Sequence, residues 1–193
     1  MSVQKAGKSR LFFAFWPDAP TRAALQATQA AAPAPMGRPV VPAQWHLTLA
    51  FCGWQSATVC AQLAQLDMIR ALPAIGVELD RRIFWPEARA WVLEACEPPA
   101  SLLSMQRIFQ QHLHAMGVRV DPKPYRPHVT WVRGVTEAPT GPWVMPLSPP
   151  ILWPLHELVL MASQPNQEGS VYTPVSRWRH DATADAFIPI EGG

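Results

Sequence analysis

Short apolar runs alternate with longer stretches of helical spacing along the chain. The pattern predicts strands and helices in an α+β order, with a proline-rich loop at 33–42. In chain order the predicted elements are strand 10–16, helix 17–32, strand 44–51, helix 56–72, strands 74–85 and 89–96, helix 98–117, and strands 126–133, 151–164 and 169–180. Residues 182–193 carry no such pattern, and we expect them to form a loosely held end.

Residues at the helix boundaries support these assignments. Asp18 and Ser56 stand where a side-chain oxygen can cap the first two helices, and Gly117 stands where the third helix can end. Pro86 and Glu87 form the expected turn between the paired strands 74–85 and 89–96.

One unit of strand, helix and strand occurs twice. The separations match closely: 35 residues from Leu11 to His46, and 38 from Ala90 to His128. A degenerate duplication of this kind predicts one two-lobed domain over residues 1–193. We expect antiparallel sheets related by a pseudo-twofold axis, with helices on the outside and a central cleft.

Each repeat contains a histidine and a threonine two residues apart in an apolar strand, His46 with Thr48 and His128 with Thr130. Alternation along a strand places both members of a pair on one face. The symmetry of the repeats can then bring the two histidines face to face across the cleft.

The composition indicates a globular protein and excludes one that coats double-stranded nucleic acid. Its 193 residues are 49% hydrophobic and 16% charged, which suffices for a sizeable core. The net charge of +2 is too small for a protein that covers nucleic acid. The cations nevertheless gather near His128, at Arg119, Lys123, Arg126 and Arg133, and form a candidate anion site. Alternatively, they are the solvated charges of long loops in a chain with 22 prolines.

Cysteine usage and hydropathy indicate a cytoplasmic protein. Cys52, Cys60 and Cys96 form no paired motif, so we expect reduced, mostly buried thiols. The apolar run after the basic N-terminal residues is only six residues long, which is too short for a signal peptide. No run approaches transmembrane length, and we expect a monomer without a membrane partner.

The other four histidines suggest no second site, and the motifs do not suggest a metal site. His112 and His114 fall on different faces of the third helix, and His156 and His180 have no companion. A metal bound by His46 and His128 would need a third ligand, which neither motif offers at ligand spacing. We therefore expect no metal.

Two imidazoles across a cleft suit general acid–base catalysis. Near pH 7 an imidazole can accept a proton from water while its twin protonates a leaving oxygen. Threonine hydroxyls beside them can hold the oxygens where negative charge develops. In-line displacement at phosphorus needs the attacking and leaving oxygens on opposite sides, which a twofold pair of histidines supplies.

The two motifs, His46-Leu47-Thr48-Leu49 and His128-Val129-Thr130-Trp131, resemble the paired H-x-T-hydrophobic motifs of the two-histidine (2H) phosphoesterases. Within that superfamily the chain is similar to the bacterial RNA 2′,3′-cyclic phosphodiesterases, historically named 2′-5′ RNA ligases. The likeness rests on four landmarks in order: RLFFAFWPDAPTRAAL, HLTLAFCG, YRPHVTWVR and LVLMASQPNQEGSVYTPVSRW. Trp131 and Cys52 depart from it, since smaller aliphatic and leucine side chains are usual there.

The resemblance implies a bilobal fold, no cofactor, and hydrolysis of RNA or nucleoside 2′,3′-cyclic phosphates to 2′-phosphates. It also implies a weak, reversible 2′-5′ joining activity. His128 is then the base for water and His46 the acid for the 3′ oxygen, while Thr48 and Thr130 hold the phosphate. Two alternatives stay open: a phosphodiesterase for another small cyclic phosphate, such as an ADP-ribose derivative, and a non-catalytic RNA- or nucleotide-binding module.

Phe51 and Arg133 each lie five residues after a histidine, at equivalent places in the repeats. An aromatic ring and a guanidinium plane are both stacking surfaces for a base, and Arg133 can also contact phosphate. Because Cys52-Gly53 and Gly134 suggest that both strands end here, we expect these side chains at the cleft. Strict alternation would instead turn Phe51 to the core.

Overall fold

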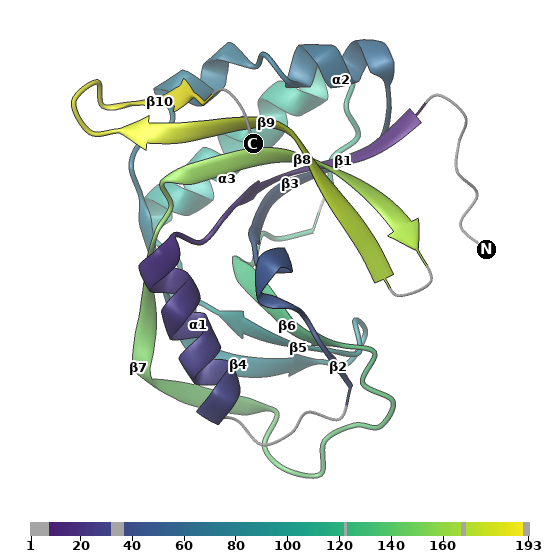
Figure 1. Cartoon of the computed structure of the whole chain (residues 1–193), viewed down its shortest axis with the longest axis vertical. Coiled ribbons are helices and arrows are strands. Elements are labelled where there is room, and N and C mark those ends of the chain that lie inside the picture. Colours follow the sequence, from purple (N-terminus) through teal and green to yellow (C-terminus); the bar gives the residue numbers. More distant parts are fainter. Residues whose placement is uncertain (1–7, 32–36, 122, 167–168, 191–193) are drawn as a thin grey trace.

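The computed structural model (Figure 1) describes residues 8–31, 37–121, 123–166 and 169–190. Its strands are β1 (Lys8–Phe15), β2 (Arg38–Pro39), β3 (Leu47–Ser56), β4 (Gly76–Trp85), β5 (Ala90–Glu94), β6 (His128–Arg133), β7 (Val144–Pro154), β8 (Glu157–Asn166), β9 (Gly169–Asp181) and β10 (Ala186–Pro189). Its helices are α1 (Ala19–Ala31), α2 (Ala57–Leu63) and α3 (Ala100–Ala115), with short 3₁₀ segments η1 (Pro42–Gln44) and η2 (Asp67–Ala71).

The strands form one open antiparallel sheet, in the order β10-β9-β8-β1-β3-β6-β5-β4-β7, with β2 against β6. This order reads symmetrically about the centre, because β8-β1-β3 on one side corresponds to β4-β5-β6 on the other. The α+β class and the duplicated unit are therefore confirmed. At the centre β3 and β6 meet through Leu47 and Val129, which directly follow the two histidines.

The helices cover the outer face of this sheet. In Figure 1, α2 and α3 lie over the half that holds β1 and β3, whereas α1 lies beside β7 of the other half. The helix of each repeat thus covers the half of the sheet that contains the strands of the other repeat: α1 lies against β7, and α3 against β3. The cleft is left on the uncovered face.

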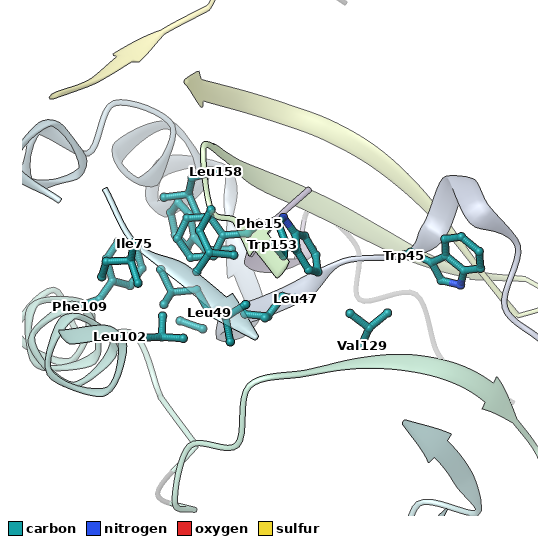
Figure 2. Close-up of a cluster of buried hydrophobic side chains, with 14 of the residues drawn as sticks. Phe15, Trp45, Leu47, Leu49, Ile75, Leu102, Phe109, Val129, Trp153 and Leu158 are labelled. Carbon is teal, nitrogen blue, oxygen red and sulfur yellow. The ribbon is translucent and has the colours of Figure 1, made fainter. Parts of the chain in front are cut away.

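The larger of two apolar clusters among the described residues lies between the sheet and the helices (Figure 2). Trp45, Leu47 and Leu49 alternate with the polar cleft residues and point into it, where they are almost fully buried. Phe109 of α3 packs edge-on against Phe13, with ring centroids 4.9 Å apart. The histidine-bearing strand is therefore anchored by its opposite face.

An irregularity in β3 sets the direction of Phe51. Ala14 pairs with Thr48 and Phe13 with Ala50, so Leu49 has no partner on β1. The extra residue forms a bulge, which reverses the alternation beyond it. Phe51 consequently shares the cleft face with Thr48.

The same irregularity occurs at the equivalent place in β6. Val92 pairs with Thr130 and Trp91 with Val132, so Trp131 has no partner on β5. Arg133 therefore shares the cleft face with Thr130, as Phe51 does with Thr48.

The expected end of the first histidine strand at Cys52-Gly53 is wrong, because β3 continues to Ser56. A second irregularity leaves Cys52 without a partner on β1, and Gly53 adopts a φ of 68° there. Trp54 is thereby kept on the face of Phe51. The second strand does end as expected at Arg133, before Gly134 with a φ of 64°.

The helix boundaries follow their predicted caps. Thr21 N–H donates to Asp18 Oδ1 (2.9 Å), and Val59 N–H donates to Ser56 Oγ (3.3 Å). Gly117 has a φ of 79° and ends α3. The predicted helix over 56–72 is too long, since α2 stops at Leu63 and the chain continues in the separate segment η2.

Two predictions for the C-terminal part are also wrong. The single strand expected over 151–164 is two strands, because the chain crosses at Leu155 and His156 from β7, which pairs with β4, to β8, which pairs with β1. The end expected to be loose contains β10, which pairs with β9. Phe187 holds it there, since its side chain is fully buried.

Candidate active site

Both histidines are oriented by the same local hydrogen bond. His46 Nδ1 lies 2.6 Å from Gln44 O, and His128 Nδ1 lies 2.7 Å from Arg126 O. A carbonyl oxygen only accepts, so in both rings Nδ1 carries the proton and donates it. Nε2 is then left as the basic nitrogen of each neutral imidazole.

Aromatic rings surround His46. Trp16 stacks on it with ring centroids 5.2 Å apart and an interplanar angle of 9°. Phe12 lies at 5.1 Å, and Tyr172 meets it edge-on at 5.4 Å. These contacts fix the ring in one orientation and exclude water from much of its surface.

His128 packs instead against Trp85, with ring centroids 4.4 Å apart. The guanidinium of Arg126 lies over the same indole, 4.5 Å from its centroid. Trp85 therefore connects the second histidine to a charged neighbour.

Burial lowers the pKa of His46 from its ordinary value of 6.5 to about 4, although the bond to Gln44 opposes this. The positive charges of Arg133 and His128 lower it further. Burial lowers the pKa of His128 as well, and there the bond to Arg126 and the Glu94 carboxylate oppose the decrease. The two imidazoles are therefore in electrostatically different surroundings.

Glu94 is a buried carboxylate opposite His128 in the register of β5 with β6. It accepts hydrogen bonds from Arg81 Nε (2.9 Å) and from Arg126 Nη2 (2.7 Å to Oε2). A buried charge of this kind is tolerated because it is paired and hydrogen-bonded. Glu94 thus holds Arg126, whose carbonyl and guanidinium both support His128.

The two motifs line one small cavity of about 200 Å³. His46, Thr48, His128 and Thr130 form its walls, together with Arg133. The register at the twofold axis explains this, since pairing of Leu47 with Val129 sets each histidine opposite the threonine of the other motif. The predicted catalytic and phosphate-binding residues are therefore brought together.

A larger cavity of about 430 Å³ adjoins the first and shares His46, Thr48 and Arg133 with it. Phe51 lines this larger cavity, and 38% of its surface is exposed. Both residues predicted to stack a base therefore lie at the cleft, although for Phe51 the cause is the bulge at Leu49.

The basic loop contributes less than the sequence suggested. Among Arg119, Lys123, Arg126 and Arg133, only Arg133 lines these two cavities. Arg126 is paired with Glu94, and Arg119 and Lys123 are exposed. The expectation of mostly buried thiols is likewise wrong for Cys96, which is exposed.

Sequence reasoning missed several residues of the site. Arg10 and Phe12 alternate on β1 and could have been found as a polar and an aromatic residue on one strand face. Glu94 is an acid inside an apolar strand, which is also a readable signal. Ser163 and Tyr172 come from distant strands, and the sequence offers no sign of their proximity.

Within the described residues, no three His, Cys, Asp or Glu side chains gather in a way that could hold a metal ion. None of the described helices is both long and apolar enough to cross a bilayer.

Comparison with known proteins decides the family. The chain is 31% identical to the RNA 2′,3′-cyclic phosphodiesterase of Escherichia coli (strain K12) over 148 residues, which are 76% of this chain and 81% of that protein. The chain belongs to the RNA 2′,3′-cyclic phosphodiesterase family. The resemblance to the two-histidine phosphoesterases is thereby confirmed. No family model matches the chain.

Solved structures agree with this membership of the cyclic phosphodiesterases. A crystal structure of a phosphoesterase shares 31% identity and a TM-score of 0.75, covering 89% of this chain and 97% of that one. E. coli LigT complexed with ATP has 31% identity and a TM-score of 0.73, with 90% and 98% covered. TT0787 of Thermus thermophilus has 25% identity and a TM-score of 0.71, with 87% and 96% covered.

Proposed function

We propose that this chain hydrolyses the 2′,3′-cyclic phosphate at the end of RNA or of a nucleoside to a 2′-phosphate. One observation carries the proposal: two equivalent His-x-Thr pairs line a single cavity of about 200 Å³, each imidazole with its Nδ1 bonded to a backbone carbonyl. The named activity of the E. coli relative, an RNA 2′,3′-cyclic phosphodiesterase, supports it.

In the proposed reaction His128 Nε2 accepts a proton from water as the water oxygen bonds to phosphorus. The bond from phosphorus to the 3′ oxygen breaks, and His46 Nε2 donates its proton to that oxygen. Thr48, Thr130 and Arg133 hold the non-bridging oxygens. The two imidazoles supply both proton transfers, so we propose catalysis without metal or cofactor. If a 5′-hydroxyl attacked phosphorus in place of water, the same loss of the 3′ oxygen would form a 2′-5′ phosphodiester, and the reverse of that step would re-form the cyclic phosphate.

This assignment requires the substrate to change the state of His46. Its pKa in the protein is about 4, so at pH 7 the imidazole is neutral and its Nε2 carries no proton to donate. A bound phosphate anion offsets the charge of Arg133 and stabilises the imidazolium. Binding would thereby prepare the acid that the reaction needs.

The site is complete within one chain, which supports a monomer acting as a single two-lobed unit over residues 1–193. Among the described residues, the three thiols are free, consistent with a cytoplasmic protein.

The test is to incubate the protein, with EDTA present, with an oligonucleotide ending in 2′,3′-cyclic phosphate, and to identify the product against standards. A 2′-phosphomonoester is expected, and a deoxyribose 3′-end should be inert. A dominant 3′-phosphate would show that the 2′ oxygen, and not the 3′ oxygen, is the leaving group. Activity restored only by Zn²⁺ or Mn²⁺ would contradict metal-free catalysis. Turnover restricted to an ADP-ribose cyclic phosphate would favour that substrate, and tight RNA binding without turnover would favour a binding module.

A further inference from the structure

Three cavities follow one another along the uncovered face of the sheet. The cavity between the histidines shares His46, Thr48 and Arg133 with the larger one. The larger one shares Arg10 and Ser163 with a third cavity of about 290 Å³. The cleft therefore continues from the catalytic pair across β1 and β8.

The chemistry of this path is uniform. The described residues that line the three cavities include the cations Arg133, Arg38, Arg10 and Lys8. The same lining contains no Asp or Glu. The same cavities are also lined by the aromatic side chains Phe51, Tyr172 and Trp54. Cationic side chains interleaved with aromatic rings are typical of proteins that bind single-stranded nucleic acid.

The register of the strands explains why these side chains share one face. Arg10 pairs with Trp54 on β3 and with Ser163 on β8, and the irregularity at Cys52 keeps Trp54 in phase with Phe51. The Arg10 guanidinium lies over the Phe51 ring, 4.7 Å from its centroid. Arg10 therefore lies where the second cavity, of about 430 Å³, meets the third, of about 290 Å³.

Resting on the proposed function, we infer that the RNA upstream of the cyclic phosphate lies along this path and that the enzyme favours oligonucleotide ends over mononucleotides. The terminal nucleoside occupies the cavity of about 430 Å³, with its base between Phe51 and Arg133. The preceding phosphate lies at Arg10. The preceding base lies in the third cavity beside Trp54 and Lys8. A mononucleotide contacts only the first two cavities.

The experiment compares kcat/KM for cytidine 2′,3′-cyclic phosphate and for a tricytidylate ending in the same cyclic phosphate. The wild-type protein should prefer the trinucleotide by about 10-fold or more. Arg10→Gln and Trp54→Ala should each remove most of that preference, because they remove an upstream phosphate contact or stacking surface. Arg107→Gln is the matched control, since Arg107 is an exposed cation on α3; its ratio should not change.

Binding of a tricytidylate and of cytidine, each with a 2′-phosphate, is measured beside turnover at several salt concentrations. Arg10→Gln should reduce the salt dependence of trinucleotide binding by about 0.7 in the log–log slope, the value for one lost contact with a single strand. Equal losses on both substrates would overturn the inference, because Arg10 would then act only through Phe51. Wild-type turnover and binding that do not depend on length would overturn it as well.

These measurements also separate the two proposals. If neither cyclic phosphate is turned over but binding depends on length and on Arg10, the proposed reaction fails and the RNA path stands. If both are turned over equally and bind equally, the reaction stands and the RNA path fails.

Discussion

Leu47 and Val129 are partners in the antiparallel register of β3 with β6. They hold equivalent places in the two repeats, one residue after each histidine, so the pseudo-twofold axis passes between them. Both side chains point into the core and are almost fully buried. This apolar contact, on the opposite face of the sheet from the cleft, is what sets the two His-x-Thr pairs beside one another.

The state of His46 should depend on whether phosphate is bound. NMR titration of the free protein should give a pKa near 4 for His46, because burial and Arg133 disfavour its charge. With a saturating nucleoside 2′-phosphate the pKa should rise, since the anion offsets Arg133. A pKa that does not move on binding would remove His46 as the acid and favour the opposite assignment of roles.

Protonation of His46 should also destabilise the fold. In the unfolded chain its pKa is ordinary, so between pH 6.5 and about 4 the unfolded state binds more protons than the folded state. Stability is therefore lost as the pH falls through that window. Chemical denaturation of His46→Ala should show a shallower loss over the same range, whereas the exposed control His112→Ala should follow the wild type. Identical pH dependence in all three proteins would contradict the depressed pKa.

Glu94→Gln should affect catalysis through His128. The substitution keeps the shape but removes the anion that Arg81 and Arg126 share and that favours the His128 imidazolium. The limb of the rate profile that reports His128 should move to lower pH, and the free energy of unfolding should fall by about 1–3 kcal/mol.

Arg70→Gln removes a partner from the exposed pair with Asp67 and is the matched control, with little effect expected on either quantity. If Glu94→Gln lost stability without any shift of the pH profile, Glu94 would have a structural role only.

Phe51→Ala and Arg133→Ala should each weaken nucleotide binding. Loss of one stacking surface costs about 1–3 kcal/mol per base, seen as a higher KM. Arg133→Ala should also lower kcat, because Arg133 lines the cavity of about 200 Å³ that holds the two histidines as well as the cavity of about 430 Å³ proposed for the base. Ile108→Ala, which truncates an exposed apolar side chain on α3, is the control for Phe51. Unchanged kinetics in both cleft variants would remove base stacking from the mechanism.

Periodicity predicted the histidine strands, α1, α3 and the duplicated unit, because each is encoded by local alternation and capping. It did not predict the bulges at Leu49 and Trp131, which depend on how β3 and β6 pair with their neighbours. It also missed β10, whose attachment depends on burial of Phe187 by elements distant in sequence. Ser163 was missed for the same reason, since its place at the cleft depends on the pairing of β8 with β1.

The central claim is that both histidines carry out one reaction, and turnover by single variants tests it most directly. Rates of His46→Ala and His128→Ala should be measured with an RNA ending in 2′,3′-cyclic phosphate, alongside their thermal melts. Each variant should stay folded, since both side chains line the cleft and are only half-buried, and each should lose at least about 100-fold in rate, the lower range for a general acid or base. Near-normal turnover by either folded variant would contradict the two-histidine mechanism.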